Sequence, residues 1–102
     1  MITKSPGEHL GTVDVTFELP ASVDARRIAI VGDFNAWDSE RDLLQRQVEG
    51  TWRHTVTLPA GRRYRFRYLL DGHRWENDWA ADDYVANDFG GNDSVVRTDR
   101  HR

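Results

Sequence analysis

Apolar and polar side chains alternate along much of this chain, and the alternation is strongest over residues 63–70. There Tyr64, Phe66, Tyr68 and Leu70 occupy one set of alternate positions, and three arginines followed by Leu69 occupy the other. A period of two residues predicts a strand with one buried side and one side facing water. An Asp-Gly dipeptide follows directly, and this is the commonest sequence of a tight hairpin turn. We therefore expect a strand and hairpin here.

The same alternation, or a short β-branched run, marks the other strands. It predicts strands over residues 13–19, 28–31, 52–58 and 94–97. The turn signal at Ala60-Gly61 favours a hairpin between the strand at 52–58 and the strand that follows it. Residues 43–48 fit a short strand and a single helical turn equally well. Residues 76–93 are expected to be an irregular loop anchored by aromatic side chains, and loops of that length in compact domains tend to be functional.

These elements together define the fold class. Short strands with a turn signal roughly every 8 to 12 residues, without any stripe of helical period, predict an all-β sandwich. At 102 residues the chain has the length of one domain. We expect a flexible lead-in over residues 1–11, a β-sandwich over residues 12–98 and a charged tail over residues 99–102.

Composition and charge narrow the functional classes. Hydrophobic residues make up 38% and charged residues 30% of the chain, which is typical of a folded globular protein. The net charge of -3 disfavours nucleic acid and anionic lipid as partners. The absence of cysteine excludes disulfides and thiolate chemistry. No signal peptide and no apolar run of membrane-spanning length are visible, so we expect a cytoplasmic protein.

The polar residues give little support for catalysis or metal binding. The acidic side chains after residue 75 are numerous, but a small sandwich offers little depth in which to bury a carboxyl group and raise its pKa. The four histidines lack the spacing of a zinc site, and the aspartates lack the pattern of an EF-hand loop. We therefore expect no catalytic residue, no metal and no cofactor.

The arginines at positions 62, 63, 65 and 67 raise the question of a nucleic-acid surface. The alternation argues against it, because the arginines and the aromatic side chains of this strand point to opposite faces and cannot share a stacking platform. A solvated strand face with carboxylate partners on neighbouring strands is the simpler interpretation.

The tryptophans are the most informative residues. Trp52 occupies an apolar strand position, whereas Trp37, Trp75 and Trp79 lie among polar residues. A flat indole beside polar side chains suits a pyranose ring, whose apolar C–H face stacks on the aromatic ring while its hydroxyls form hydrogen bonds. Alternatively, each indole folds over an open end of the sandwich. For Trp79 both interpretations stay open.

Ordered motifs along nearly the whole chain resemble one family. They are Gly-Asp-Phe-Asn-Ala-Trp at residues 32–37, Trp52, the stretch from Leu-Pro-Ala-Gly to Asp-Gly at residues 58–72, Trp75, and Asn-Asp-Phe-Gly-Gly-Asn-Asp-Ser-Val-Val at residues 87–96. Over about residues 12–98 the chain resembles the isoamylase N-terminal early-set domain, or carbohydrate-binding module family 48, which includes the glycogen-binding domain of the AMP-activated protein kinase β subunit. The resemblance implies an immunoglobulin-like antiparallel β-sandwich that binds α-1,4-linked glucans such as glycogen and starch.

The resemblance also implies a binding site made of Trp37, Arg65, Trp75, Phe89 and Asp93. The two tryptophans match the pair that clasps the glucan in the kinase module. Arg65 corresponds to a lysine of that module and Asp93 to an asparagine, and both would bond to sugar hydroxyls. Phe89 corresponds to a leucine and would make an apolar contact.

Two positions depart from the family pattern. Gly91 stands where the kinase module has a threonine, so it offers no hydroxyl, and Asp93 can only accept hydrogen bonds where an asparagine also donates. The implied partners are an α-glucan, such as glycogen or a maltooligosaccharide, and a glycogen-metabolism or regulatory protein. The alternative is a protein-interaction domain of the same fold without a sugar site, which would use an exposed sheet face or the segment 76–93.

Overall fold

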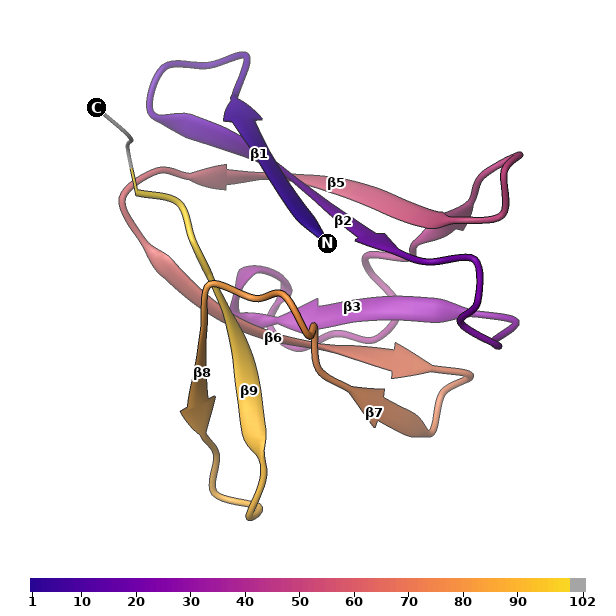
Figure 1. Ribbon diagram of the computed structural model, residues 1–102. Helices are drawn as coiled ribbons and strands as arrows, with labels where there is room; N and C mark the ends of the chain where they lie inside the picture. Colours follow the sequence, from indigo (N-terminus) through magenta and orange to yellow (C-terminus); the bar gives the residue numbers. More distant parts are fainter. Residues whose placement is uncertain (100–102) are drawn as a thin grey trace.

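Residues 1–99, the part that the computed structural model describes, form two antiparallel sheets packed face to face (Figure 1). Sheet A has the order β1 (Ile2–Pro6), β2 (Thr12–Leu19), β5 (Trp52–Pro59), β4 (Gln45–Arg46). Sheet B has the order β3 (Ile28–Gly32), β6 (Arg63–Leu70), β9 (Asn92–Arg97), β8 (Asp83–Ala86), and β7 (Arg74–Glu76) pairs with β6. The predicted immunoglobulin-like, all-β antiparallel sandwich is confirmed.

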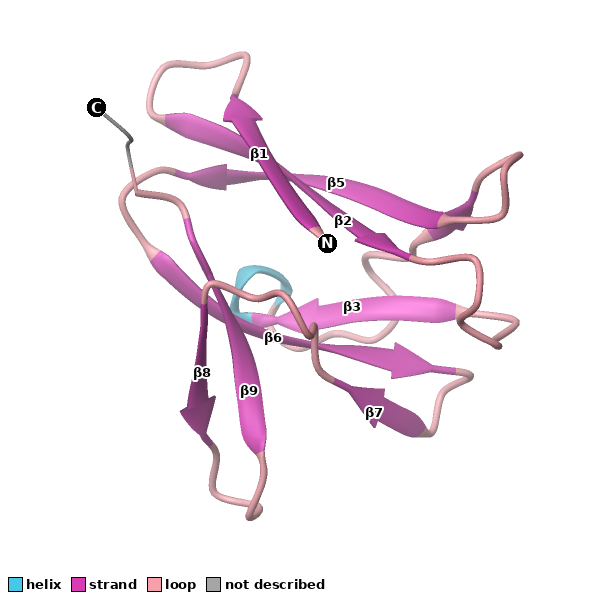
Figure 2. Cartoon of the chain, in the orientation of Figure 1, coloured by secondary structure: helices cyan, strands magenta, loops and turns pink. Residues whose placement is uncertain are grey.

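One turn of 3-10 helix, η1 (Asp33–Asn35), interrupts this all-β architecture (Figure 2). It follows β3 directly and lies beside β6. Among the described residues no helix has the length and apolarity needed to cross a membrane.

The hydrophobic core fills the space between the sheets. Tyr64, Phe66 and Tyr68 on β6 are buried, whereas the arginines at the alternate positions reach the surface. Phe17 on β2 meets Phe66 edge to face, with ring centroids 5.1 Å apart. The alternation predicted from the sequence is confirmed. The inner face of β6 packs directly against sheet A, through the contact of Phe66 with Phe17.

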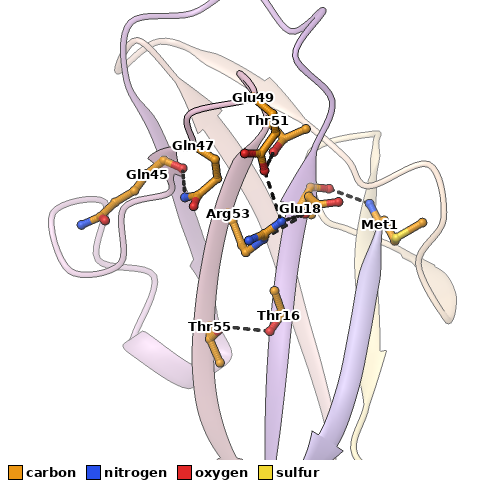
Figure 3. Close-up of polar contacts among 9 residues, drawn as sticks. All are labelled: Met1, Thr16, Glu18, Gln45, Gln47, Glu49, Thr51, Arg53 and Thr55. Atoms are coloured by element: carbon orange, nitrogen blue, oxygen red, sulfur yellow. Dashed lines mark hydrogen bonds and ion pairs between the residues drawn. The ribbon is translucent and has the colours of Figure 1, made fainter.

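The outer face of sheet A is polar and paired across its strands (Figure 3). The hydroxyls of Thr16 and Thr55 lie 2.8 Å apart, and Arg53 Nη2 donates to Glu18 Oε2 at 2.7 Å. The ammonium group of Met1 donates to the carbonyl oxygen of Glu18 at 2.6 Å. Cross-strand pairs of this kind are typical of a solvated sheet face.

The predicted hairpin between β5 and β6 is wrong. The two strands lie in different sheets, so the turn between them carries the chain from sheet A to sheet B. Its amides are bonded to other parts of the chain: Ala60 N–H donates to the Gly11 carbonyl at 2.8 Å, and Gly61 N–H donates to the Thr98 carbonyl at 2.7 Å. A turn whose amides are used in this way does not close a ladder between its own flanking strands.

Two segments differ from the predictions made from the sequence, and a third resolves an alternative that the sequence left open. Residues 2–6 of the expected flexible lead-in form β1, which pairs with β2 from Ile2↔Phe17 to Pro6↔Val13. The expected irregular loop at residues 76–93 contains β8, because Asp83 through Ala86 pair with β9. Residues 43–48 contain the short strand β4. Residues 100–102 of the expected charged tail lie outside the described residues.

Gly32 is required at the end of β3 because the backbone of β6 passes directly beside it. A Cβ at this position would meet the carbonyl oxygen of Arg65 and lie 2.8 Å from the Cβ of Phe66. We expect Gly32→Ala to lower the free energy of unfolding by about 2 to 3 kcal/mol, the upper part of the usual cost of overpacking, because the Cβ would meet backbone atoms of β6. Urea unfolding followed by tryptophan fluorescence measures it.

The matched control is Gly61→Ala. Gly61 has a φ of 76°, and a Cβ there would have nothing within 4 Å, so only the left-handed backbone opposes alanine. Its expected cost is about 1 kcal/mol. A loss for Gly32→Ala no larger than that of the control would contradict the close approach of β3 and β6.

Asp71 ties the β6–β7 turn to the connection that precedes β3. Its Oδ1 accepts hydrogen bonds from the amides of Arg26 at 2.8 Å and Arg27 at 3.0 Å, and these bonds hold the pKa of Asp71 below its ordinary value. A pKa lowered by folding contributes stability that is present above the unfolded-state pKa and is lost as the pH falls through the folded-state pKa.

Asp71→Asn keeps an acceptor oxygen but removes the charge. We expect this variant to be less stable than wild type at pH 7, with a deficit that shrinks as the pH falls from roughly 5 to 3, because wild type alone loses the ionised carboxylate. Urea midpoints measured at pH 7, 4.5 and 3 follow the deficit. A deficit that is the same at all three values would show that charge plays no part.

Candidate functional site

The loop after β3 holds Trp37 in a fixed place. Ala36 and Trp37 both have a φ of 58°, a left-handed conformation that costs about 1 to 2 kcal/mol for a residue with a side chain. The buried side chain of Asn35 supports this conformation, since its Oδ1 accepts the Gly32 amide at 3.0 Å and its Nδ2 donates to Asp42 Oδ2 at 2.9 Å. The strain is therefore compensated within the loop itself.

Asp33 fixes the direction of the Trp37 ring. The indole Nε1–H of Trp37 donates to Asp33 Oδ1 at 3.0 Å, and the other carboxylate oxygen accepts the backbone amide of Arg65 at 2.8 Å. One carboxylate thus links the indole edge to the backbone of β6. The ring itself is 38% exposed, so its faces can meet another molecule while its edge is held.

Trp75 reaches the same region from the hairpin on the other side of β6. It lies on β7 opposite Leu69 and is 43% exposed. The guanidinium carbon of Arg67 lies 5.5 Å from the centroid of the Trp75 ring, which is cation–π distance. The Nε–H of Arg67 is buried and has no hydrogen-bond partner within the described chain. The cation–π contact places this guanidinium beside the Trp75 ring.

The turn between β8 and β9 supplies the remaining wall. Asn87 shapes the turn, because its Oδ1 accepts the amides of Phe89 at 2.9 Å and Gly91 at 3.1 Å. Its Nδ2 donates to Oδ1 of the buried Asp93 at 3.2 Å. Phe89 at the tip is 93% exposed. The turn therefore presents an apolar ring to solvent and a carboxylate at its base.

These three parts enclose one cleft of about 470 Å³. It is lined by Trp37, Arg67, Trp75, Asn87, Phe89 and Asp93. Three of these six residues are aromatic, and the other three bring a guanidinium, an amide and a carboxylate. Such a surface suits a flat ligand with an apolar face and neutral polar edges.

Four of the five residues that the sequence places in a site lie together in this cleft. The fifth, Arg65, lies beside it: its side chain is half exposed and its Nη1 is 3.9 Å from Asp93 Oδ2. Arg67 lines the cleft instead, and no role was expected for it or for Asn87. Alternation along β6 puts Arg65 and Arg67 on the same face but does not say which of them stands over Trp75. That depends on where β7 pairs.

Trp79 does not fold over the end of the sandwich. It is 80% exposed and lies outside the cleft, so the interpretation of Trp79 as a lid is wrong. Trp52, by contrast, is buried as its strand position predicts.

Tyr68 and Asp78 form a titratable pair away from the cleft. Tyr68 OH donates to Asp78 Oδ2 at 2.7 Å inside the core, where burial and the neighbouring Asp78 carboxylate raise the pKa of Tyr68 well above its ordinary value. Such a phenol stays protonated and serves as a hydrogen-bond donor. Within residues 1–99 no cluster of three or more histidine, aspartate or glutamate side chains is arranged to hold a metal ion.

Comparisons with known proteins agree with this architecture. Residues 7–85 match the family model of carbohydrate-binding module 48, the isoamylase N-terminal domain. The chain is 38% identical over 73 residues to a 1,4-alpha-glucan branching enzyme of Rhizobium etli. This aligned region covers 63% of this chain and 10% of the enzyme. The chain is also 42% identical over 76 residues to the 1,4-alpha-glucan branching enzyme of Bordetella pertussis. That aligned region covers 66% of this chain and 10% of the enzyme.

The chain thus spans about a tenth of the length of these relatives. The family match at residues 7–85 includes the strands from β2 to β7, the loop of Trp37 and most of β8, and it leaves out β1 and β9. The chain belongs to the carbohydrate-binding module 48 family, the isoamylase N-terminal domains.

Proposed function

We propose that this chain is a non-catalytic module that binds α-1,4-linked glucan, such as glycogen or a maltooligosaccharide, in the cleft between Trp37 and Trp75. One observation carries the proposal: two indoles, one from the loop after β3 and one from strand β7, open into the same cleft, and each contacts a neighbouring side chain. Pyranose rings offer apolar C–H faces that stack on such indoles. The family match and the family name support a carbohydrate as the ligand.

The polar groups of the cleft suit the hydroxyls of a neutral sugar. Arg67 brings guanidinium N–H donors, and Asp93 brings acceptor oxygens. Arg65 contributes from the rim through its contact with Asp93. Phe89 adds an apolar contact, whereas Gly91 adds no hydroxyl at the position where the resembling kinase module has a threonine. The site therefore depends more on stacking than on hydrogen bonds.

The relatives agree with this ligand class, since the matched proteins are named for 1,4-alpha-glucan branching. We extend only the ligand class to this chain, because the match covers about a tenth of those enzymes. A glycogen-metabolism or regulatory protein as partner and a cytoplasmic location are parts of the same proposal. Nucleic acid and membrane surfaces are not proposed as partners, given the net charge of -3.

Replacing either tryptophan of the cleft tests the proposal. We expect Trp37→Ala and Trp75→Ala each to weaken binding of β-cyclodextrin at least tenfold, or about 1.4 kcal/mol, because each removes one stacking surface. Calorimetric titration measures the affinity, and circular dichroism checks the fold. The control is Val48→Ala, since Val48 is fully exposed and does not line the cleft.

Two outcomes would contradict glucan binding at this cleft. In the first, wild type binds neither β-cyclodextrin nor glycogen, which would favour the alternative of a protein-interaction domain without a sugar site. In the second, wild type binds but both tryptophan variants match the Val48→Ala control.

Arg65 and Arg67 form a matched pair, because both lie on the outer face of β6 two residues apart. We expect Arg67→Met to weaken β-cyclodextrin binding more than Arg65→Met, by about fivefold or more, since only Arg67 lines the cleft and stands over Trp75. The same titrations measure both variants. An equal loss of affinity in both variants, or a larger loss for Arg65→Met, would contradict the assignment of the polar contact to Arg67 and assign it to Arg65 at the rim.

A further inference from the structure

Trp79 is presented to solvent by a loop that is firmly held at both ends. The segment of residues 79–81 forms a short arch between Asp78 and Asp82, and Trp79 is 80% exposed at its start. An exposed indole on a loosely held loop needs no explanation. On a loop held at both ends, the exposure of the indole is determined by the folded structure of the loop.

Asp78 anchors the first end of the arch from inside the core, where it is fully buried. Its Oδ2 accepts the hydroxyl of Tyr68 at 2.7 Å, its Oδ1 accepts the Ala80 amide at 2.8 Å, and its own amide donates to Ser94 Oγ at 2.9 Å. The hydroxyl of Tyr84 donates to its carbonyl oxygen at 2.5 Å. The conformation of the residue before Trp79 is therefore determined by four hydrogen bonds.

Asp82 anchors the second end. Its amide donates to the Val95 carbonyl at 3.0 Å, and its Oδ2 accepts the Arg97 amide at 2.7 Å. The ammonium group of Lys4, on β1 of the other sheet, lies 2.6 Å from the same carboxylate oxygen. With both ends fixed, only three residues are left to arch outward, and the indole has little freedom to fold back.

The arch lies apart from the cleft described above. Its anchors Tyr68 and Ser94 face the interior of the sandwich, whereas their neighbours Arg67 and Asp93 line the cleft on the opposite face of sheet B. Figure 1 shows the connection from β7 to β8 running on the side of sheet B that faces the N-terminus and sheet A. Trp79 is accordingly absent from the cleft lining.

We propose that Trp79 is a second stacking platform for α-glucan, separate from the cleft. This inference rests on the proposed function, because it assigns the same ligand class to a second surface. The indole would receive one glucose ring, with the small side chains of Ala80 and Ala81 leaving its approach open. A chain of a branched or long glucan would reach this platform while another part of the polymer occupies the cleft.

The size and surroundings of the platform favour a sugar over a protein. A stable protein interface buries about 800 Å² on each partner, several times what one indole provides. The neighbouring Asp82 and Asp83 are charged and occupied in ion pairs with Lys4 and Arg63, so they do not extend the apolar surface. A single pyranose face, by contrast, needs one aromatic ring and open space above it.

Two platforms on one domain predict a difference between short and polymeric ligands. A small ligand that fills the cleft gains nothing from the second platform, whereas a polymer held at one platform meets the other at high effective concentration. Weak stacking at Trp79 would then strengthen binding to glycogen and leave binding of β-cyclodextrin to the cleft unchanged.

The experiment compares Trp79→Ala, Trp79→Phe and the Val48→Ala control in glycogen affinity electrophoresis and in β-cyclodextrin calorimetry. We expect Trp79→Ala to weaken glycogen binding about threefold to tenfold, with a smaller loss for Trp79→Phe, which keeps a smaller ring. The cleft affinity for β-cyclodextrin should equal that of the control. In a Trp37→Ala/Trp75→Ala background, residual glycogen binding should disappear on adding Trp79→Ala.

The outcomes separate this inference from the proposed function. If Trp79→Ala leaves glycogen binding unchanged while the cleft variants lose it, the second platform is refuted and the cleft stands. If Trp79→Ala weakens β-cyclodextrin binding as much as glycogen binding, Trp79 acts through the fold and the inference also fails. If wild type binds no glucan at all, both proposals fall together.

Discussion

The pleat of β6 is the constraint on which the rest of the structure depends. Consecutive side chains of a strand must point to opposite faces, so Tyr68 enters the core and Arg67 enters the cleft from adjacent positions. Because β6 pairs with β3, β7 and β9, the elements that carry the cleft are all registered to it. Even the loop of Trp37 is tied to β6, through the bond from the Arg65 amide to Asp33. A shift of β6 by one residue would exchange core and cleft together.

The sequence predicts the parts of this fold that depend on local pattern. β2, β5 and β6 alternate visibly, and the Asp71-Gly72 turn closes the hairpin to β7 as expected. β1 and β8 escaped prediction because they are edge strands formed by pairing with β2 and β9, with few apolar side chains of their own. The hairpin predicted between β5 and β6 was wrong for a related reason. The residues of the turn specify a sharp reversal, but the sheet that the next strand joins is decided by distant partners.

The candidate site shows the same division between local and distant causes. The motif with Trp37, the hairpin with Trp75 and the turn with Phe89 can each be read from the sequence, and the structure brings them together. The sequence could not predict that Arg67, and not Arg65, lines the cleft. Alternation defines the face of the strand on which a side chain lies, but not its position along the strand. The exposure of Trp79 could not be read either, since it results from the burial of Asp78 against Tyr68.

The loops of Trp37 and Trp79 are built in the same way. In each, a buried polar side chain just before the indole, Asn35 in one and Asp78 in the other, bonds to nearby backbone amides and holds the loop from within. The ordering of these loops is therefore achieved on folding, before any ligand arrives. Flexible oligosaccharides lose much conformational entropy when bound, and a surface that is already rigid adds no further cost of its own. The buried amide and carboxylate thus hold both exposed rings in place, as the proposed stacking on glucan requires.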